Sequence, residues 1–156
     1  MQGTGSIAIG NNAGQTNQEY DSVAIGVNCG QFNQSSGSVA IGYNAGNTSQ
    51  AASSVAIGSY SGQVSQSYAT IAIGYKSGQF SQGTACVALG AGASTTGQGE
   101  SAVAIGALAG SDKQQGAGVA IGVRAAEFGQ GEGAVAVGYQ SGRFTQSNGC
   151  VAIGIS

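Results

Sequence analysis

Pairs of aliphatic residues recur along the chain at a fixed interval of sixteen residues. The segment Ser22-Val23-Ala24-Ile25-Gly26 returns at 38–42 and at 54–58. Looser copies begin at Ile7, Ile71, Val87, Val103, Val119, Val135 and Val151. In each copy the two aliphatic residues are two positions apart, which is the spacing of one side of a β-strand. The pattern therefore predicts a short strand in every repeat. A helix is disfavoured because each interior glycine costs about 1 kcal/mol relative to alanine.

Several columns are constant when the sequence is written in rows of sixteen from Gly5, which gives nine full rows and a partial tenth. Column three is Val or Ile, column four is Ala and column six is Gly in all ten rows. One row cannot bury an apolar face alone, but stacked rows bury it continuously. We therefore expect one all-β domain over residues 1–156, a parallel β-solenoid (β-roll) with one coil per sixteen residues and about ten coils. At about 4.8 Å per coil, the rod would be on the order of 48 Å long. We expect the glycine of column six to lie at a tight corner with a positive φ.

A second strand is expected around columns ten to fourteen, where one glutamine is constant. An exposed glutamine would vary between repeats, as columns eleven and fifteen do. Constancy thus predicts a buried or half-buried ladder in which each amide donates to the next along the stack. The alternative is a glutamine that only caps the turn backbone. The predicted amide ladder comprises Gln18, Gln34, Gln50, Gln66, Gln82, Gln98, Gln114, Gln130 and Gln146.

The Val-Ala-Ile strand has two sides, and the repeat pattern leaves open which of them faces the interior. We expect Val and Ile to point inward, because only they have the volume to separate two sheets, and the constant Ala to lie against a close partner outside. In the alternative, Ala points inward, the roll is very thin, and Val and Ile form an exposed apolar strip typical of an interaction site. Both arrangements predict self-association. The predicted contact face comprises Ala8, Ala24, Ala40, Ala56, Ala72, Ala88, Ala104, Ala120, Ala136 and Ala152.

Column twelve contains all four phenylalanines, in alternation with Thr, Val and Asp. The four are Phe32, Phe80, Phe128 and Phe144. A mixed column of Phe and Thr indicates a half-exposed edge that accepts either residue. A strip on which a glycan stacks is the alternative.

Composition and charge exclude several classes of function. Charged residues make up 6% of the 156 residues, against roughly 25% in typical domains. The regular Val and Ile positions argue against disorder. Four basic residues and a net charge of −2 cannot neutralise a run of phosphates, so nucleic-acid binding is not expected. The apolar runs are too short to insert into a membrane. No signal peptide is recognisable. The chain stops partway through a repeat, and we take it to be a piece of a longer protein.

The residues needed for catalysis or metal binding are missing or scattered. The chain has no histidine, its six acidic residues are dispersed, and no phosphate-binding loop or zinc spacing occurs. Cys29, Cys86 and Cys150 replace serine or alanine and are expected to be small buried residues. Cys86 and Cys150 lie four coils apart, roughly 19 Å, too far for a disulfide. We expect a protein that is not an enzyme and that holds no metal or cofactor.

The repeat resembles the head repeat of trimeric autotransporter adhesins, the YadA-like head. Residues 22–26, 38–42 and 54–58 match its Ser-Val-Ala-Ile-Gly core, and Ser61, Ser77 and Ser141 match its later serine. Residues 8–18 are similar to repeats in fibre-like proteins of phages and large DNA viruses. The resemblance covers nearly the whole chain. It implies a left-handed parallel β-roll, a homotrimer whose strand faces meet near the threefold axis, and an extracellular place on a cell or virion surface. It also implies attachment to a host-surface or glycan ligand.

Two classes of function therefore compete. The first is a non-catalytic structural and adhesive rod of a surface adhesin or viral fibre-like protein. The alternative is an ice-binding solenoid that presents a flat face of small residues, such as the ladder that includes Ser6, Ala8 and Gly10. A glycan-degrading solenoid enzyme is a third idea, against which the missing pairs of acidic residues argue.

Overall fold

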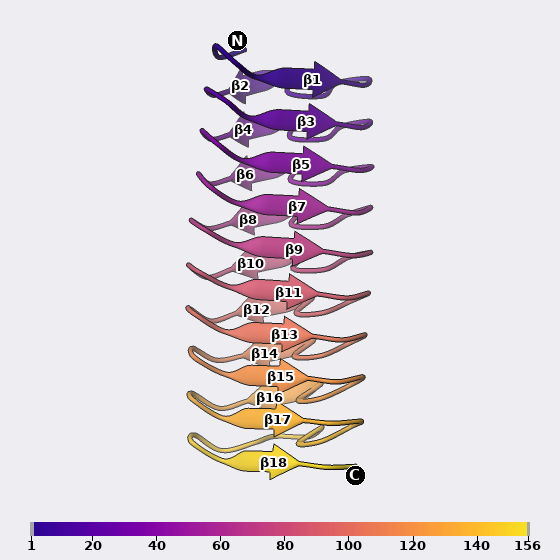
Figure 1. Cartoon of the computed structure of the whole chain (residues 1–156), viewed down its shortest axis with the longest axis vertical. Helices are drawn as coiled ribbons and strands as arrows, with labels where there is room; N and C mark the ends of the chain where they lie inside the picture. Colours follow the sequence, from indigo (N-terminus) through magenta and orange to yellow (C-terminus); the bar gives the residue numbers. More distant parts are fainter. Residues whose placement is uncertain (1, 156) are drawn as a thin grey trace.

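The computed structural model describes residues 2–155 and shows an all-β parallel solenoid with one turn per sixteen residues. About nine turns stack into a rod, and one further strand begins the next turn (Figure 1). The described residues contain no helix. The predicted fold class is confirmed.

The first strand of every coil belongs to a single parallel ten-stranded sheet. Its strands lie in front in Figure 1 and all point the same way. They are β1 (Ile7–Ile9), β3 (Val23–Ile25), β5 (Val39–Ile41), β7 (Val55–Ile57), β9 (Ile71–Ile73), β11 (Val87–Leu89), β13 (Val103–Ile105), β15 (Val119–Ile121), β17 (Val135–Val137) and β18 (Val151–Ile153).

The second strand of each of the first eight coils runs back behind the first and belongs to an eight-stranded parallel sheet (Figure 1). Its members are β2 (Thr16–Gln18), β4 (Phe32–Gln34), β6 (Thr48–Gln50), β8 (Val64–Gln66), β10 (Phe80–Gln82), β12 (Thr96–Gln98), β14 (Asp112–Gln114) and β16 (Phe128–Gln130). These strands occupy columns twelve to fourteen, within the span that the repeat pattern predicts.

Neighbouring coils pair in register, so that each residue lies beside the residue sixteen positions away. In β3 and β5, for example, Ala24 pairs with Ala40. The amide of Val23 donates to the carbonyl of Ser38 at 2.9 Å. Because the step is constant, every column of the sequence becomes a straight ladder of like side chains along the rod.

A glycine corner after each strand of the ten-stranded sheet makes this close stacking possible. Gly26 has a φ of +132°, which side-chain-bearing residues rarely adopt. A methyl group on Gly26 would lie 2.6 Å from the carbonyl oxygen of Gly42 in the next coil. The column-six glycine therefore lies at a tight corner and has a positive φ, and both predictions are confirmed.

A left-handed residue in the middle of each strand of the eight-stranded sheet turns the glutamine inward. In β4, Asn33 has a φ of +56°. Phe32 and Asn33 are both exposed as a result, whereas Gln34 is fully buried. A strictly extended strand would instead place Phe32 and Gln34 on the same side.

Alanine, not valine or isoleucine, faces the interior, so the expected orientation of the Val-Ala-Ile strand is wrong. Eight of the ten column-four alanines have no solvent exposure: Ala24, Ala40, Ala56, Ala72, Ala88, Ala104, Ala120 and Ala136. Ala8 is exposed and Ala152 half-buried, because β1 and β18 each pair with a strand on one side only. The interior is narrow: a methyl group on Gly30 would lie 3.2 Å from the Cβ of Ala24. Glutamine side chains fill the remaining space, and large aliphatic residues do not fit.

Candidate functional site

An uninterrupted aliphatic surface covers the outer side of the ten-stranded sheet. We call columns three and five of this sheet the aliphatic strip. Its first column comprises Ile7, Val23, Val39, Val55, Ile71, Val87, Val103, Val119, Val135 and Val151, and its second Ile9, Ile25, Ile41, Ile57, Ile73, Leu89, Ile105, Ile121, Val137 and Ile153. Most of these side chains are half-buried, and the exposed fraction reaches 40% at Leu89 within the rod. The Val-Ala-Ile strand therefore has the alternative orientation, in which the roll is thin and Val and Ile form an apolar strip on the outside.

Bulky residues flank the aliphatic strip on the side that follows the glycine corner. Column seven supplies six of them, all exposed: Val27, Tyr43, Tyr75, Val123, Tyr139 and Ile155. Tyr60, in column eight, packs edge-on between two of these tyrosines, with ring centroids 5.3 Å from Tyr43 and 6.4 Å from Tyr75. The apolar surface therefore extends around one edge of the sheet.

Columns two to seven contain no charged residue in any coil. All ten charged residues of the chain occupy other columns. Depletion of charge is a feature of the buried centre of protein interfaces. The strip thus differs in composition from the rest of the surface, which carries every charge.

The predicted contact face of column-four alanines does not form, since eight of these side chains lie inside the coil. Ser22, Ser38 and Ser54 of column two are also fully buried. The outward ladder of column-two and column-four residues that the ice-binding alternative named therefore does not form in these coils. The physical reason is that small side chains are the ones that fit between two closely spaced sheets.

The column-fourteen glutamines form a buried ladder over the C-terminal part of the rod. Side-chain amides donate from Gln66 to Gln82, and onward through Gln98, Gln114 and Gln130 to Gln146, at distances between 2.9 and 3.4 Å. The structure gives no such link between Gln18, Gln34, Gln50 and Gln66, whose Oε1 atoms are buried without a partner. The ladder thus joins six of the nine glutamines.

The same glutamines also connect the two sheets across the interior. Gln98 Nε2 donates to the carbonyl of Val87 at 2.9 Å and to that of Ala102 at 3.0 Å. Gln34 makes the equivalent bonds to Val23 and Ser38, at 2.7 and 3.4 Å. The sequence left open whether these glutamines form a ladder or only cap the turn backbone. In the C-terminal coils one side-chain amide makes both kinds of hydrogen bond.

Column eleven forms an outer polar ladder that the repeat pattern did not reveal. Gln31 Nε2 donates to Gln15 Oε1 at 2.8 Å, and Asn47 Nδ2 donates to Gln31 Oε1 at 3.1 Å. Near the C-terminal end, Arg143 and Glu127 form an ion pair at 2.7 Å in the same column. Variable residues can pair in this way because any neighbouring donor and acceptor suffices. The column therefore lacks the constancy that signals a buried ladder.

Three phenylalanines of column twelve lie on the outer face of the eight-stranded sheet, and Phe144 follows them in the ninth coil, which has no second strand. Phe32, Phe80 and Phe128 are 39 to 41% exposed, and Phe144 is 68% exposed. The rings of Phe128 and Phe144 stack with centroids 5.9 Å apart, and Arg143 lies over both. They occupy a half-exposed edge, as the mixed composition of the column predicts.

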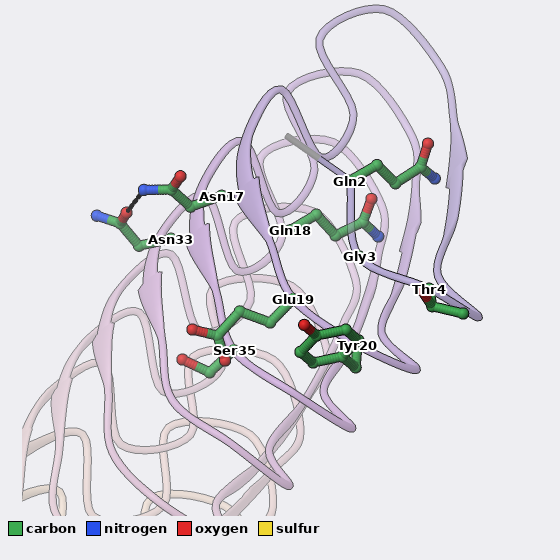
Figure 2. Close-up of a pocket in the computed structure, with 9 residues that line it drawn as sticks. All are labelled: Gln2, Gly3, Thr4, Asn17, Gln18, Glu19, Tyr20, Asn33 and Ser35. Carbon is green, nitrogen blue, oxygen red and sulfur yellow. Dashed lines mark hydrogen bonds between the residues drawn. The ribbon is translucent and has the colours of Figure 1, made fainter.

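A pocket of about 480 Å³, lined mainly by polar residue types, lies at the N-terminal end of the rod. Figure 2 shows its lining residues: Gln2, Gly3, Thr4, Asn17, Gln18, Glu19, Tyr20, Asn33 and Ser35. Asn17 Nδ2 donates to Asn33 Oδ1 at 3.0 Å. Glu19 accepts from the backbone and hydroxyl of Ser36, both at 3.1 Å. Glu19 is the sole carboxylate of the lining, so the pocket offers no pair of acids for hydrolysis.

Within residues 2–155, no cluster of three or more His, Cys, Asp or Glu side chains is placed to hold a metal ion. The described part of the chain also contains no helix long and apolar enough to cross a membrane.

Comparisons with models of protein families, with curated proteins and with solved structures gave no match to this chain.

Proposed function

We propose that this chain is a non-catalytic structural and adhesive rod that associates with further copies of itself through the aliphatic strip. The observation that carries the proposal is the unbroken column of Val and Ile side chains on the outer face of the ten-stranded sheet. With nine steps of about 4.8 Å between β1 and β18, this surface is about 43 Å long.

The size and composition of the strip favour a protein partner. Soluble monomers rarely expose a long, contiguous apolar patch, and such patches mark interaction sites. Transfer of each aliphatic side chain from water to an apolar contact is favourable by about 25 cal/mol per Å². A charged partner surface gains nothing here, because columns two to seven offer no charge of either sign.

A second copy of the same chain fits this surface best. Two parallel copies share one repeat of sixteen residues, so every coil of one rod meets a coil of the other at the same height. A partner with a different pitch would lose this match after a few coils. The resemblance to the YadA-like head repeat supports a homotrimer and a left-handed roll.

The adhesive role and an extracellular place on a cell or virion surface follow from the same resemblance to adhesin heads and viral fibre-like proteins. A rod that is joined to its own copies along one face still exposes the eight-stranded sheet. Its phenylalanines and polar residues are then available to a host-surface or glycan ligand.

The mass of the protein in solution tests self-association. In sedimentation equilibrium at about 50 µM, we expect the natural chain to have the mass of three copies. The double variant Ile57→Glu with Ile105→Glu places two charges on the strip and should be monomeric with an unchanged β circular-dichroism spectrum. Ser49→Glu with Ser81→Glu places the same charges on the exposed side of the eight-stranded sheet and should stay associated. A monomeric natural chain would overturn the proposal.

A further inference from the structure

One coil in the middle of the rod lacks the side chains that the other coils place at the corner after the glycine. In columns seven and eight, the coil of residues 85–100 has only Ala91 and Gly92. Every other complete coil has at least one larger side chain there: Asn11 and Asn12, Val27 and Asn28, Tyr43 and Asn44, Tyr60, Tyr75 and Lys76, Leu108, Val123 and Arg124, or Tyr139 and Gln140. The gap is a notch of about 370 Å³ in an otherwise continuous edge.

Three successive coils supply the walls of this notch. Tyr75 and Lys76 come from the preceding coil, and Ala107 and Leu108 from the following one. Ala91, Gly92 and Thr95 complete the lining.

The side chain of Leu108 leans over the floor of the notch. A methyl group on Gly92 would lie 2.8 Å from Leu108 Cδ2. Leu108 itself has a φ of +59°, an unfavourable conformation for a large residue. In three other coils the same column contains asparagine, which tolerates a positive φ. A leucine at this position incurs a conformational cost, and it supplies the notch with an apolar wall.

The exposed surface of the notch is almost entirely apolar, and Lys76 is one of its lining residues. Thr95 Oγ1 already donates to the carbonyl of Gly92 at 2.9 Å, so its hydroxyl proton is engaged. Lys76 Nζ lies 5.3 Å from the centre of the Tyr75 ring. Lys76 has no carboxylate within 4.0 Å, since Arg143 with Glu127 is the one ion pair among the described residues. It is also the sole basic residue between positions 1 and 112.

We propose that the notch binds a small aromatic carboxylate. The flat ring packs against Tyr75 and Leu108 above the floor formed by Ala91 and Gly92, and the carboxylate accepts a hydrogen bond from Lys76 Nζ. Small-ligand sites are mostly apolar, with a few polar groups that fix the orientation of the ligand. An ammonium group without a carboxylate partner favours an anion over a neutral ring. This binding lies outside the aliphatic strip and does not depend on the proposed self-association.

Three probes separate the contributions of ring and charge. Benzoate has both, benzyl alcohol has the ring alone, and acetate has the charge alone. In a heteronuclear NMR titration of the ¹⁵N-labelled chain, benzoate should give saturable shifts at residues 91, 92 and 108. We expect benzyl alcohol to bind about threefold more weakly, the effect of one partly exposed ion pair. Acetate should give no saturable shift at these residues.

Two substitutions test the site with residues that the same columns contain in other coils. Ala91→Tyr restores the tyrosine found at 43, 75 and 139 in column seven, fills the notch, and should abolish benzoate binding. Lys76→Asn introduces the asparagine of column eight and should reduce benzoate affinity to that of benzyl alcohol. Val123→Tyr and Arg124→Asn introduce the same residues two coils beyond Ala91 and three coils beyond Lys76, and should leave binding unchanged.

Each possible result either supports or overturns the proposal. Saturable benzoate binding that Ala91→Tyr abolishes and Lys76→Asn weakens supports the proposal. Benzoate binding that survives Ala91→Tyr overturns the proposal, as does equal affinity for benzyl alcohol and benzoate. The absence of a saturable shift at about 10 mM benzoate, ten times a Kd of 1 mM, also overturns it.

Discussion

The side-chain Nε2 of Gln34 donates to the carbonyl oxygen of Val23 at 2.7 Å, across the interior of a single coil. This bond links β4 to β3 and places a polar group where a globular protein usually has a large apolar one. Alanine can line the opposite wall because the amide spans the distance between the sheets. The glutamine column is therefore the main filler of the core as well as its hydrogen-bond donor.

Removal of one such amide should be costly. Gln98→Met keeps the length of the side chain but removes its hydrogen bonds to the carbonyls of Val87 and Ala102. It also leaves the buried Gln82 Nε2 and Gln114 Oε1 without a partner. Each unsatisfied buried group costs about 1–3 kcal/mol. We expect a loss of about 3 kcal/mol in the free energy of unfolding, measured by urea denaturation.

Two further methionine variants separate the ladder from the brace between the sheets. Gln34 has the two backbone bonds but no amide partner, so Gln34→Met should cost about 1 kcal/mol less than Gln98→Met. Gln115 follows the buried Gln114 but is exposed, and Gln115→Met should be nearly neutral. Equal losses at positions 34 and 98 would show that the amide ladder contributes nothing.

A stabilising substitution is expected at Ser94. This residue replaces the usual glycine of column ten, has a φ of +46°, and buries its Oγ without a hydrogen-bond partner. Ser94→Gly removes both the unpaired hydroxyl and the left-handed strain. We expect the unfolding free energy to rise by about 1–2 kcal/mol in urea denaturation.

Ala126 provides the matched comparison, since it occupies the same column with a φ of +47°. Ala126→Gly relieves the same strain but loses a buried methyl group, worth about 0.8 kcal/mol. The net change should be close to zero. If both glycine variants change stability equally, the buried hydroxyl of Ser94 is not the source of the cost.

The corner glycines should not tolerate even one methyl group. Gly58 has a φ of +122°, and an added Cβ would lie 2.7 Å from the carbonyl oxygen of Gly74. Gly58→Ala should lower the unfolding free energy by about 3 kcal/mol or more. Gly133 has a φ of +62° with nothing within 4 Å, so Gly133→Ala should cost about 1 kcal/mol. Thermal unfolding followed by circular dichroism measures both, and similar losses would contradict this account.

Alkaline pH should destabilise the protein through Cys29. Burial of this thiol removes it from water and raises its pKa from 9.0 to about 11. The folded state therefore holds the proton to higher pH than the unfolded state does. The stability gained from this is fully present below pH 9 and is lost as the pH rises from 9 to 11. The loss should be about 2–3 kcal/mol, from about 1.4 kcal/mol per pKa unit.

Urea denaturation of the natural chain and of Cys29→Ala at pH 8, 9.5 and 11 measures this effect. Alanine is found in the same column at Ala45, Ala93, Ala109 and Ala125, so the variant should fold normally. Its stability should fall less steeply between pH 9 and 11. Parallel pH profiles would assign the alkaline loss to other groups. The buried Cys86, whose pKa is also raised by burial, contributes the same background to both proteins.

The sixteen-residue period was enough to predict the architecture, but it did not decide which side of each strand lies inside. The alternation in Val23, Ala24 and Ile25 tells which side chains share a side. The interior side depends on the distance between the sheets. That distance is set by turns at residues such as Gly26 and Asn33, and by the length of the glutamine opposite. The constancy of alanine was the available signal, because a narrow interior restricts size more strictly than an outer surface does.

The two polar columns also show what a comparison of repeats can predict and what it misses. Constant Gln34 and Gln50 indicated burial, and both are buried. Gln31 and Asn47 differ in type yet share a hydrogen bond in column eleven, so column-by-column comparison gave no signal there. The notch at Gly92 arises from small residues in a single coil, and only the three-dimensional stacking brings Tyr75 and Leu108 to its sides.

The close approach of Gly26 to Gly42 restricts how a gene for such a rod can change in length. Insertion or deletion of one residue within a strand would put the strand residues after it out of register with the neighbouring coils, with aliphatic residues inside and alanines outside. Gain or loss of sixteen residues leaves every ladder in register. The length of the rod can therefore change only in whole coils, and each added coil lengthens the aliphatic strip by the same increment.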